Sequence, residues 1–319
     1  MKGVLRGVIL WLGLLVLPVK AAAAELIPVG QVIGLQLYHD RVTVAAYDDV
    51  LGSTARSAGL KIGDQILQIN GKTVACAEDV RGALQSSTGE VSLTVRRAGK
   101  ERQLRFSPAN TEDGPKMGVF LRQGIAGIGT VTFYDPASGT FGALGHGVWD
   151  SEGLLKMTRG NAFEATVAEI KKGKAGDPGQ LRGTAESPIP FAPLLKNTPQ
   201  GVFGVSPHRW QGEAFATADY ESVHTGSASI RTQIGTDQPR EYSVEILKIY
   251  PETRPDHRNF LLRVTDPDLL RATGGIVQGM SGSPILQDGK LIGAVTHVLV
   301  NDPTTGYGIF IDNMLDAAG

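Results

Sequence analysis

Residues 274–296 read GGIVQGMSGSPILQDGKLIGAVT, a glycine-rich segment followed by two short apolar runs. The Asp288-Gly289 pair separates the runs, and such a pair between apolar segments is a strong signal for a β-hairpin. Glycine is favoured where the backbone adopts conformations that other residues avoid, so we expect a tight loop before the hairpin. The stretch therefore predicts antiparallel β-structure whose entering loop carries two hydroxyl groups, those of Ser281 and Ser283.

The rest of the second half of the chain has the same character. Glycine supplies 41 of the 319 residues, about 13% against a usual ~7%. Several short strands punctuated by glycine favour a barrel or sandwich over a parallel sheet. We therefore expect a mainly β chain, with short helices in its first part, such as 77–87, and in this second part a helix only at 313–318. The strand-like segments are 129–133, 203–205, 241–249, 260–264, 291–300 and 307–311.

Residues 26–107 form a separate unit, in which residues 55–74 read ARSAGLKIGDQILQINGKTV. This string closely resembles the PDZ domains of bacterial exported proteases. A PDZ fold implies a groove in which a peptide adds a strand to a sheet edge and its C-terminal carboxylate binds backbone N–H groups. The domain could instead serve only as a spacer. The residues that match the PDZ pattern are Ala55, Ala58, Gly59, Leu60, Gly63, Asp64, Ile66, Ile69, Asn70 and Gly71.

Ile33, Gly34, Leu35 and Gln36 are the best sequence candidate for the carboxylate-binding loop of this PDZ domain. The polar, Pro- and Gly-rich residues 108–118 are the expected linker. Residues 119–319 then form the second domain.

The first 25 residues, MKGVLRGVILWLGLLVLPVKAAAAE, carry early positive charges, an apolar stretch and a run of alanines. These features predict an export signal. The compact apolar run would also suit a short membrane anchor. We expect export across the cytoplasmic membrane, with possible membrane association through the N-terminus.

The formal net charge of -1 argues against nucleic acid as a partner. With Cys76 as the single cysteine, no intramolecular disulfide can form. The six histidines show no metal-ligand spacing, so no metal site and no cofactor are expected.

Ser281 is the candidate nucleophile. It lies between glycines, and Gly279, two residues earlier, can direct its N–H to the same point as the Ser281 N–H, which would form a two-donor oxyanion hole. The string resembles the G-D-S-G-G-P motif of chymotrypsin-like serine proteases, which fold as a double β-barrel. Met280 replaces the motif's aspartate, and Ser283 replaces a glycine and so adds a second hydroxyl.

His146, in FGALGHGVWD, is the candidate general base because flanking glycines would leave its ring accessible. His297 competes with it, but its register resembles the strand that lines the specificity pocket in chymotrypsin-like proteases. Thr296 and His297 are therefore expected to line the substrate pocket or to pack in the core.

A third residue should orient the imidazole. Asp266, in LRVTDP, ends a predicted strand 15 residues before Ser281 (281 minus 266). Asp150 and Asp135 are alternatives, and spacing does not choose among them.

The segments FGALGHGVWD and VTDPDLLRATGGIVQGMSGSPILQDGKLIGAVTHVLVNDPTTGYGIFIDNML strongly resemble the SpoIVB peptidase family of spore-forming bacteria. The order of export signal, PDZ domain and protease agrees. The resemblance implies a triad of His146, Asp266 and Ser281. It also implies secretion into the space between the forespore and mother-cell membranes, self-cleavage, and cleavage of a membrane-associated regulator that leads to sigma factor maturation.

Two alternative functions follow from the same features. The chain could be an exported PDZ adaptor with an inactive protease-like domain, although the complete Ser, His and Asp set argues against this. It could also be a quality-control protease of the HtrA type, but those place the PDZ domain after the protease.

Overall fold

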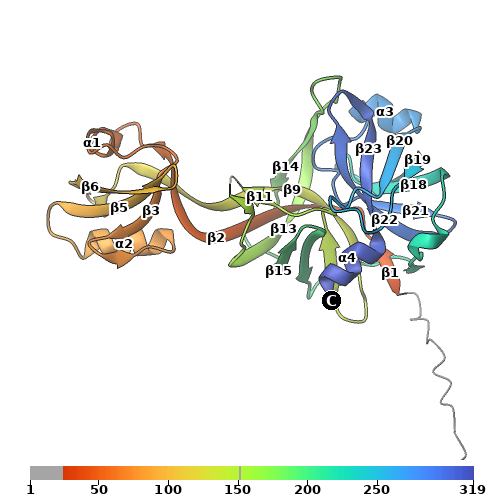
Figure 1. Cartoon of the computed structure of the whole chain (residues 1–319), viewed down its shortest axis with the longest axis horizontal. Coiled ribbons are helices and arrows are strands. Elements are labelled where there is room, and N and C mark those ends of the chain that lie inside the picture. The colour runs from red at the N-terminus through yellow and green to blue at the C-terminus, as the bar shows by residue number, and fades with distance from the viewer. Residues whose placement is uncertain (1–23, 151) are drawn as a thin grey trace, which may run out of the picture.

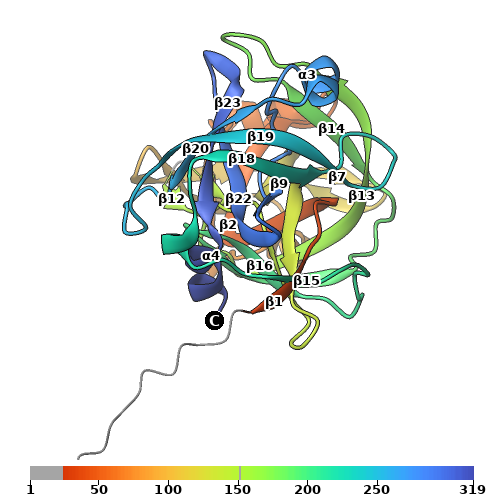
Figure 2. The ribbon, with the colours of Figure 1, turned by 90° about the vertical axis from the view of Figure 1, so that its right-hand side faces the viewer.

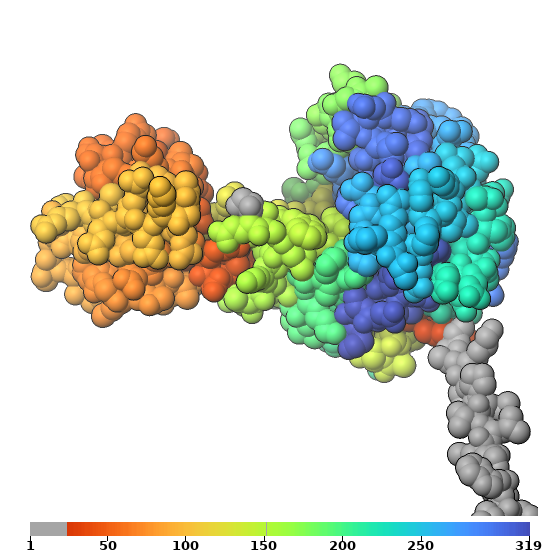
Figure 3. Space-filling view, in the orientation of Figure 1, coloured from red at the N-terminus to blue at the C-terminus, as the bar shows by residue number. Residues whose placement is uncertain are grey.

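The computed structural model describes residues 24–150 and 152–319 and is mainly β (Figure 1). A smaller body carries the N-terminal helices, a larger body carries most of the strands, and a narrower neck joins them (Figure 3). The predicted export signal lies outside the described residues except for its last two, Ala24 and Glu25. No helix in the described part of the chain is long and apolar enough to cross a membrane.

The C-terminal half of the larger body is a closed antiparallel barrel of six strands (Figure 2). The ring is closed by pairing between the first and the fourth of its strands in chain order, for example of Ser229 with Leu286. Alternate residues point inward, and Phe260 and Phe310 meet edge to face in the core with ring centroids 4.6 Å apart. Burial of each such side chain contributes roughly 1.5–3 kcal/mol. The strands are β18 (Gly226–Thr232), β19 (Arg240–Ile249), β20 (Phe260–Val264), β21 (Pro284–Gln287), β22 (Lys290–Leu299) and β23 (Asp302–Phe310).

The N-terminal half of the larger body is a second ring, in the order β9-β10-β16-β15-β13-β2. It closes because β2 also pairs with β9, for example Leu35 with Gly127. The two rings confirm the predicted double β-barrel. The strands are β2 (Val32–Tyr47), β9 (Val119–Tyr134), β10 (Thr140–Ala143), β13 (Arg159–Lys171), β15 (Ala192–Thr198) and β16 (Gly201–Val205).

The smaller body has its own core, centred on Ile66, Leu93 and Leu60. The Gly63-Asp64 pair of the PDZ-like motif serves this core: the fully buried Asp64 carboxylate binds Arg97 through two bonds of 2.6 Å. Loss of either partner of a buried pair costs about 3–5 kcal/mol. The elements are α1 (Gly52–Ser57), β3 (Gln65–Ile69), β4 (Lys72–Thr73), α2 (Ala77–Gln85), β5 (Val91–Arg97), β6 (Lys100–Phe106), β7 (Ala109–Thr111) and β8 (Gly114–Lys116).

The PDZ-like body begins and ends at places other than the predicted residues 26 and 107. Residues 33–38 of β2 pair with β13 in the first barrel, and only the later part of β2 pairs with β3 of the smaller body. β9 runs back in the same way, from the smaller body into the barrel. The predicted linker 108–118 contains the β7–β8 hairpin. The PDZ-like body is therefore an insertion into the first barrel rather than a preceding domain.

The remaining elements are short and decorate the barrels. They are β1 (Glu25–Pro28), β11 (Trp149–Asp150), β12 (Gly153–Leu154), β14 (Gln180–Ala185), β17 (Phe215–Ala216), the 3-10 turn η1 (Tyr220–Ser222), α3 (Pro267–Thr273) and α4 (Ile311–Ala318).

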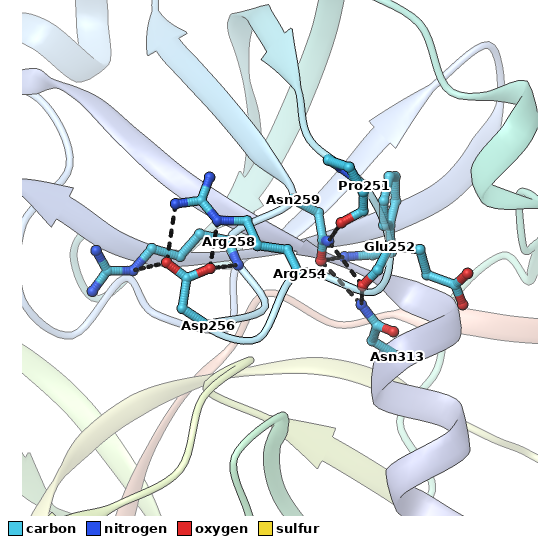
Figure 4. A network of polar contacts seen from close by, with 8 residues as sticks. Pro251, Glu252, Arg254, Asp256, Arg258, Asn259 and Asn313 are labelled. Carbon is cyan, nitrogen blue, oxygen red and sulfur yellow. Dashed lines mark hydrogen bonds and ion pairs between the residues drawn. The ribbon is translucent and has the colours of Figure 1, made fainter.

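Helix α4 is the C-terminal helix that the sequence predicted, and a polar network ties it to the loop between β19 and β20 (Figure 4). Buried Asn259 donates to the Pro251 carbonyl over 2.9 Å and accepts from Asn313 over 3.0 Å. In the same loop, Asp256 binds Arg254 and lies next to Arg258. The network fixes this loop beside the second barrel.

Candidate active site

A cleft of about 430 Å³ lies where the two barrels meet. The first barrel contributes apolar side chains from β2 and β9, such as Leu35 and Ile128, together with the loop that carries His146. The second barrel contributes Gly279, Ser281 and His297. The fold thus brings four of the residues predicted for the protease site into one cleft.

The loop that carries Ser281 is held by its own backbone and by the first barrel. The Gly282 N–H donates to the Val295 carbonyl over 2.7 Å, and Gly282 has a φ of +97°, in the region that favours glycine. Buried Thr130 of β9 holds the loop from the other side. Its N–H donates to the Ser281 carbonyl and its hydroxyl to the Gly279 carbonyl, both over 2.9 Å.

The N–H groups of Gly279 and Ser281 donate to no other group among residues 24–150 and 152–319. The first is oriented by β14, because the Gln278 carbonyl accepts from the Leu181 N–H over 2.8 Å. A peptide unit is planar and trans, so the Gly279 N–H points away from β14. Two free, fixed donors beside a serine are what an oxyanion hole requires.

Ser283 orients the second donor. Its side chain is fully buried and its hydroxyl donates to the Met280 carbonyl over 2.7 Å, where its N–H also donates over 3.0 Å. The Met280 carbonyl and the Ser281 N–H belong to one peptide unit, so this double contact directs the N–H the opposite way. The structure therefore gives the two serines different environments, because Ser281 lines the cleft and Ser283 lies beneath it.

His146 follows β10 in a sharp turn in which Leu144 and Gly145 both have positive φ. Its ring Nδ1 lies 2.8 Å from the Gly147 carbonyl oxygen, which can only accept, so Nδ1 carries the proton and Nε2 is free to accept one. Burial lowers the pKa of His146, and the bond to Gly147 opposes this only in part. The imidazole is therefore neutral at neutral pH, as a general base must be.

The Ser281 hydroxyl donates to the Thr296 carbonyl over 2.7 Å. Thr296 thus contributes its backbone to the site, while its own side chain is buried. His297 lines the cleft, with its ring centroid 5.0 Å from that of His146. Burial, the neighbouring His146 and the charge of Arg258 lower the pKa of His297 to about 4.

Asp266 has a different set of partners from those of a triad acid. It is the N-cap of α3, and its carboxylate accepts from Asp268 N–H over 2.9 Å, from Leu269 N–H over 3.1 Å and from Ser243 N–H over 3.3 Å. At His146 Nδ1, the Gly147 carbonyl occupies the place that the acid would take. The role of Asp266 as third member therefore stays a prediction.

The two alternative carboxylates are also engaged elsewhere. Asp150 pairs with Arg41 of β2, and Asp135 accepts from the Ser138 hydroxyl and the Ala137 N–H in a turn. The structure brings neither of them to His146 through a hydrogen bond among the described residues.

The predicted carboxylate-binding loop, Ile33, Gly34, Leu35 and Gln36, is wrong. These residues lie near the start of β2, where that strand runs between β9 and β13 in the first barrel, so they form a strand and not a loop. Leu35 lines the catalytic cleft instead.

The start of β9 forms one sheet edge of the PDZ-like body, and β6 forms another. The start of β9 pairs with β2 on one side, and on the other side Gln123 connects it to the segment just before α2, donating to the Ala75 carbonyl over 2.9 Å. Gly118, with a φ of +71°, forms the turn into this strand. A glycine directly before an exposed strand, in MGVFL, was the signal that could have indicated this segment.

The two barrels, the serine loop between them and the inserted PDZ-like body define a peptidase with a PDZ domain. The family model for SpoIVB peptidase S55 matches residues 113–315, and a PDZ domain model matches residues 50–97. The chain belongs to the SpoIVB peptidase S55 family, as its motifs predicted.

Similarity to curated proteins is partial. A protein of Agrobacterium fabrum named as a zinc metalloprotease is 40% identical over 90 residues, which are 28% of this chain and 23% of that protein. One of Vibrio cholerae with the same kind of name is 34% identical over 123 residues, 38% of this chain and 26% of that protein. The chain thus spans about a quarter of the length of these relatives. The described residues contain no group of three or more His, Cys, Asp or Glu side chains placed so that they could hold a metal ion.

Two solved structures are similar to parts of the chain. The active form of the protease Rv3671c from M. tuberculosis is 15% identical, with a TM-score of 0.37, and covers 61% of this chain and 75% of that one. The PDZ domain of an SdrC-like protein from Listeria monocytogenes is 23% identical, with a TM-score of 0.23, and covers 26% of this chain and 87% of that one.

Proposed function

We propose that this peptidase is a serine endopeptidase in which Ser281 is the nucleophile and His146 the general base. One observation carries the proposal: Ser281 and His146 line the same cleft as Gly279, and the N–H groups of Gly279 and Ser281 are free. A plain glycine turn would have no need of two fixed, unpaired donors.

The reaction begins when the Ser281 hydroxyl turns from the Thr296 carbonyl to His146 Nε2. Ser281 Oγ attacks the scissile carbonyl carbon, and Nε2 takes the proton. The oxyanion that forms binds the Gly279 and Ser281 N–H groups. His146 then gives the proton to the leaving amine, and water releases the acyl group by the same steps. The Gly147 carbonyl keeps the proton of the neutral imidazole on Nδ1.

Asp266 is the third member that the family resemblance implies. To act in this way, its carboxylate would have to leave the N-terminus of α3 and replace the Gly147 carbonyl at Nδ1. A carboxylate there would stabilise the imidazolium far better than a carbonyl does.

The substrate in this proposal is an exported, membrane-associated regulatory protein, and the chain also cleaves itself near its N-terminus. Membership of the SpoIVB peptidase S55 family supports a role in sporulation between the forespore and mother-cell membranes. The PDZ domain supports capture of a peptide, as a C-terminus or an extended segment.

A serine-directed fluorophosphonate tests the nucleophile in the full-length protein. We expect labelling of the wild type and no labelling of Ser281→Ala or His146→Ala, with the thermal midpoint of both variants close to that of the wild type. Labelling that persists in Ser281→Ala would exclude Ser281 as the nucleophile. If the folded wild type is not labelled, the adaptor function is favoured, since the Ser281 hydroxyl is already bonded to Thr296.

A digestion assay separates signalling from quality control. Unfolded casein should be a poor substrate for a signalling protease. Broad digestion of casein would favour the HtrA-type function.

A further inference from the structure

A second, larger cleft of about 770 Å³ adjoins the catalytic cleft. Its lining residues come from β2 and β9 on one side and from the β13–β14 hairpin and the loop after it on the other. Leu35, Gly127 and Ile128 line both clefts, so the two spaces lie next to each other. We call the second space the β14 cleft.

The walls of the β14 cleft suit apolar side chains. Phe163 and Leu181 contribute apolar surface, and Arg182 is the one charged residue of its lining. Its floor is open because a Cβ placed on Gly127 would meet nothing within 4 Å. A cleft of this size, mostly apolar with a few polar groups, is of the kind that binds a ligand.

The cleft also offers an unpaired strand edge. One edge of β14 pairs with β13 along its length. The other edge begins with the bridge between Gln180 and Gln278, and past Leu181 it pairs with no strand among residues 24–150 and 152–319. This open edge therefore starts next to Gly279, one of the two oxyanion donors. An extended peptide leaving the catalytic centre can continue the pairing that Gln278 begins.

The position of β22 indicates which half of a substrate enters the β14 cleft. The acyl half is expected along β22, where Thr296 and His297 lie. His297 lines the catalytic cleft and not the β14 cleft. The β14 cleft opens from the other end, beside Gln278. The half that follows the scissile bond would run there.

We propose that the β14 cleft binds the leaving-group half of the substrate as an added strand on β14 and selects apolar side chains in it. The inference rests on the proposed serine peptidase function of Ser281. It adds that the enzyme selects residues after the scissile bond as well as before it. The β13–β14 hairpin of the first barrel determines the selection after the bond.

The test uses internally quenched peptides with randomised residues before the scissile bond. After the bond they carry a glycinamide alone, Gly-Val-Leu-Val-amide or Gly-Glu-Asp-Glu-amide. With the full-length protein we expect the Val-Leu-Val peptides to have a kcat/KM about tenfold above both others. N-methylation of alternate backbone amides in the tail should remove most of that gain, because it removes the donors that pair with β14.

Two variants of β14 provide the matched pair. Ala185 lines the cleft, and Ala185→Trp fills its far end, so the gain should fall below about threefold. Its neighbour Thr184 is exposed and does not line the cleft, so Thr184→Trp should retain the whole gain.

Equal rates for the three peptides, in a wild type whose Ser281 is labelled by the fluorophosphonate, would overturn the inference and leave the proposed function standing. Equal loss in the two tryptophan variants would also overturn it. Absence of labelling would instead overturn the proposed function, and this inference with it.

Discussion

The loops that carry Ser281 and His146 meet in one cleft but are held in different ways. The serine loop is fixed by backbone hydrogen bonds from both barrels, including those of Thr130 and Val295, and by the buried hydroxyl of Ser283. All these contacts act on the peptide units next to the nucleophile. The oxyanion donors are therefore in place before any substrate arrives.

The histidine loop is held through the backbone of the two residues that follow the histidine. Gly147 N–H donates to the Pro199 carbonyl over 3.2 Å. The Asn197 side chain accepts from the Val148 N–H over 2.9 Å and donates to the Val148 carbonyl over 3.0 Å. Within the part of the chain that the structure describes, the one hydrogen bond of the ring is to the carbonyl of the next residue. The difference indicates that the fold fixes the backbone around the nucleophile, whereas the orientation of the His146 ring depends on its hydrogen bond to the Gly147 carbonyl.

The largest expected effect is that of replacing Asp266, the predicted partner of His146, on kcat. Asn caps helices as well as Asp does, so Asp266→Asn should leave the thermal midpoint nearly unchanged. If Asp266 completes the triad as predicted, kcat should fall by about 10⁴. Measuring kcat and the melting curve together separates the two roles, and near wild-type kcat would limit Asp266 to capping α3.

A substitution in the serine loop should come second. A Cβ on Gly282 would overlap the Thr130 carbonyl oxygen and the Leu144 nitrogen, at a φ that other residues rarely adopt. In Gly282→Ala the loop must shift, and loss of oxyanion alignment should lower kcat/KM by about 10²- to 10³-fold. Gly289→Ala, at a positive φ in the hairpin turn with no atom within 4 Å, is the control for backbone strain alone. Equal activity in the two variants would refute the preset loop.

Ser283→Ala should have a smaller effect of the same kind. It removes the hydroxyl bond to the Met280 carbonyl but keeps the backbone bond, so we expect kcat to fall about tenfold with KM little changed. Binding of a peptide boronate, which mimics the oxyanion, should weaken in parallel. A change in KM alone would show that Ser283 affects substrate binding and not the oxyanion donor.

The smallest effect should be on pH dependence. Because burial lowers the pKa of His146, the acidic limb of kcat/KM should lie below pH 6.5. His297, with its pKa lowered from 6.5 to about 4, takes up its proton more readily when unfolded, so the folded protein should lose stability as pH falls from 6.5 to 4. His297→Gln should reduce that loss by on the order of 2 kcal/mol, measured by urea unfolding. An unchanged pH dependence would argue against burial of the neutral ring.

The strand signals are local features, and the sequence therefore predicted the mainly β fold. The glycines around Ser281 and His146 are local too, and they placed both residues at turns. The PDZ insertion was not predictable in the same way. An alternating pattern shows that β2 is a strand but not that its two halves pair with different domains.

For Asp266, the sequence contained a helix-start signal that received less weight than the predicted role in the triad. An Asp directly before a Pro and an apolar run is typical of a helix start, and α3 begins there. The carboxylate that the family resemblance assigns to the triad is the same one that caps α3. Sequence distance from Ser281 could not distinguish these uses.

The path of β2 and β9 limits how the two domains can be separated. Trimming the chain from its N-terminus would remove β2 and open the first barrel long before the PDZ domain was gone. A protease lacking the PDZ domain would have to be made by excision and rejoining, at the level where Tyr38 faces Gly124 on adjacent strands. Conversely, a single cut in a PDZ loop would leave both domains attached, since the two halves of the chain would still be held across the barrel sheet.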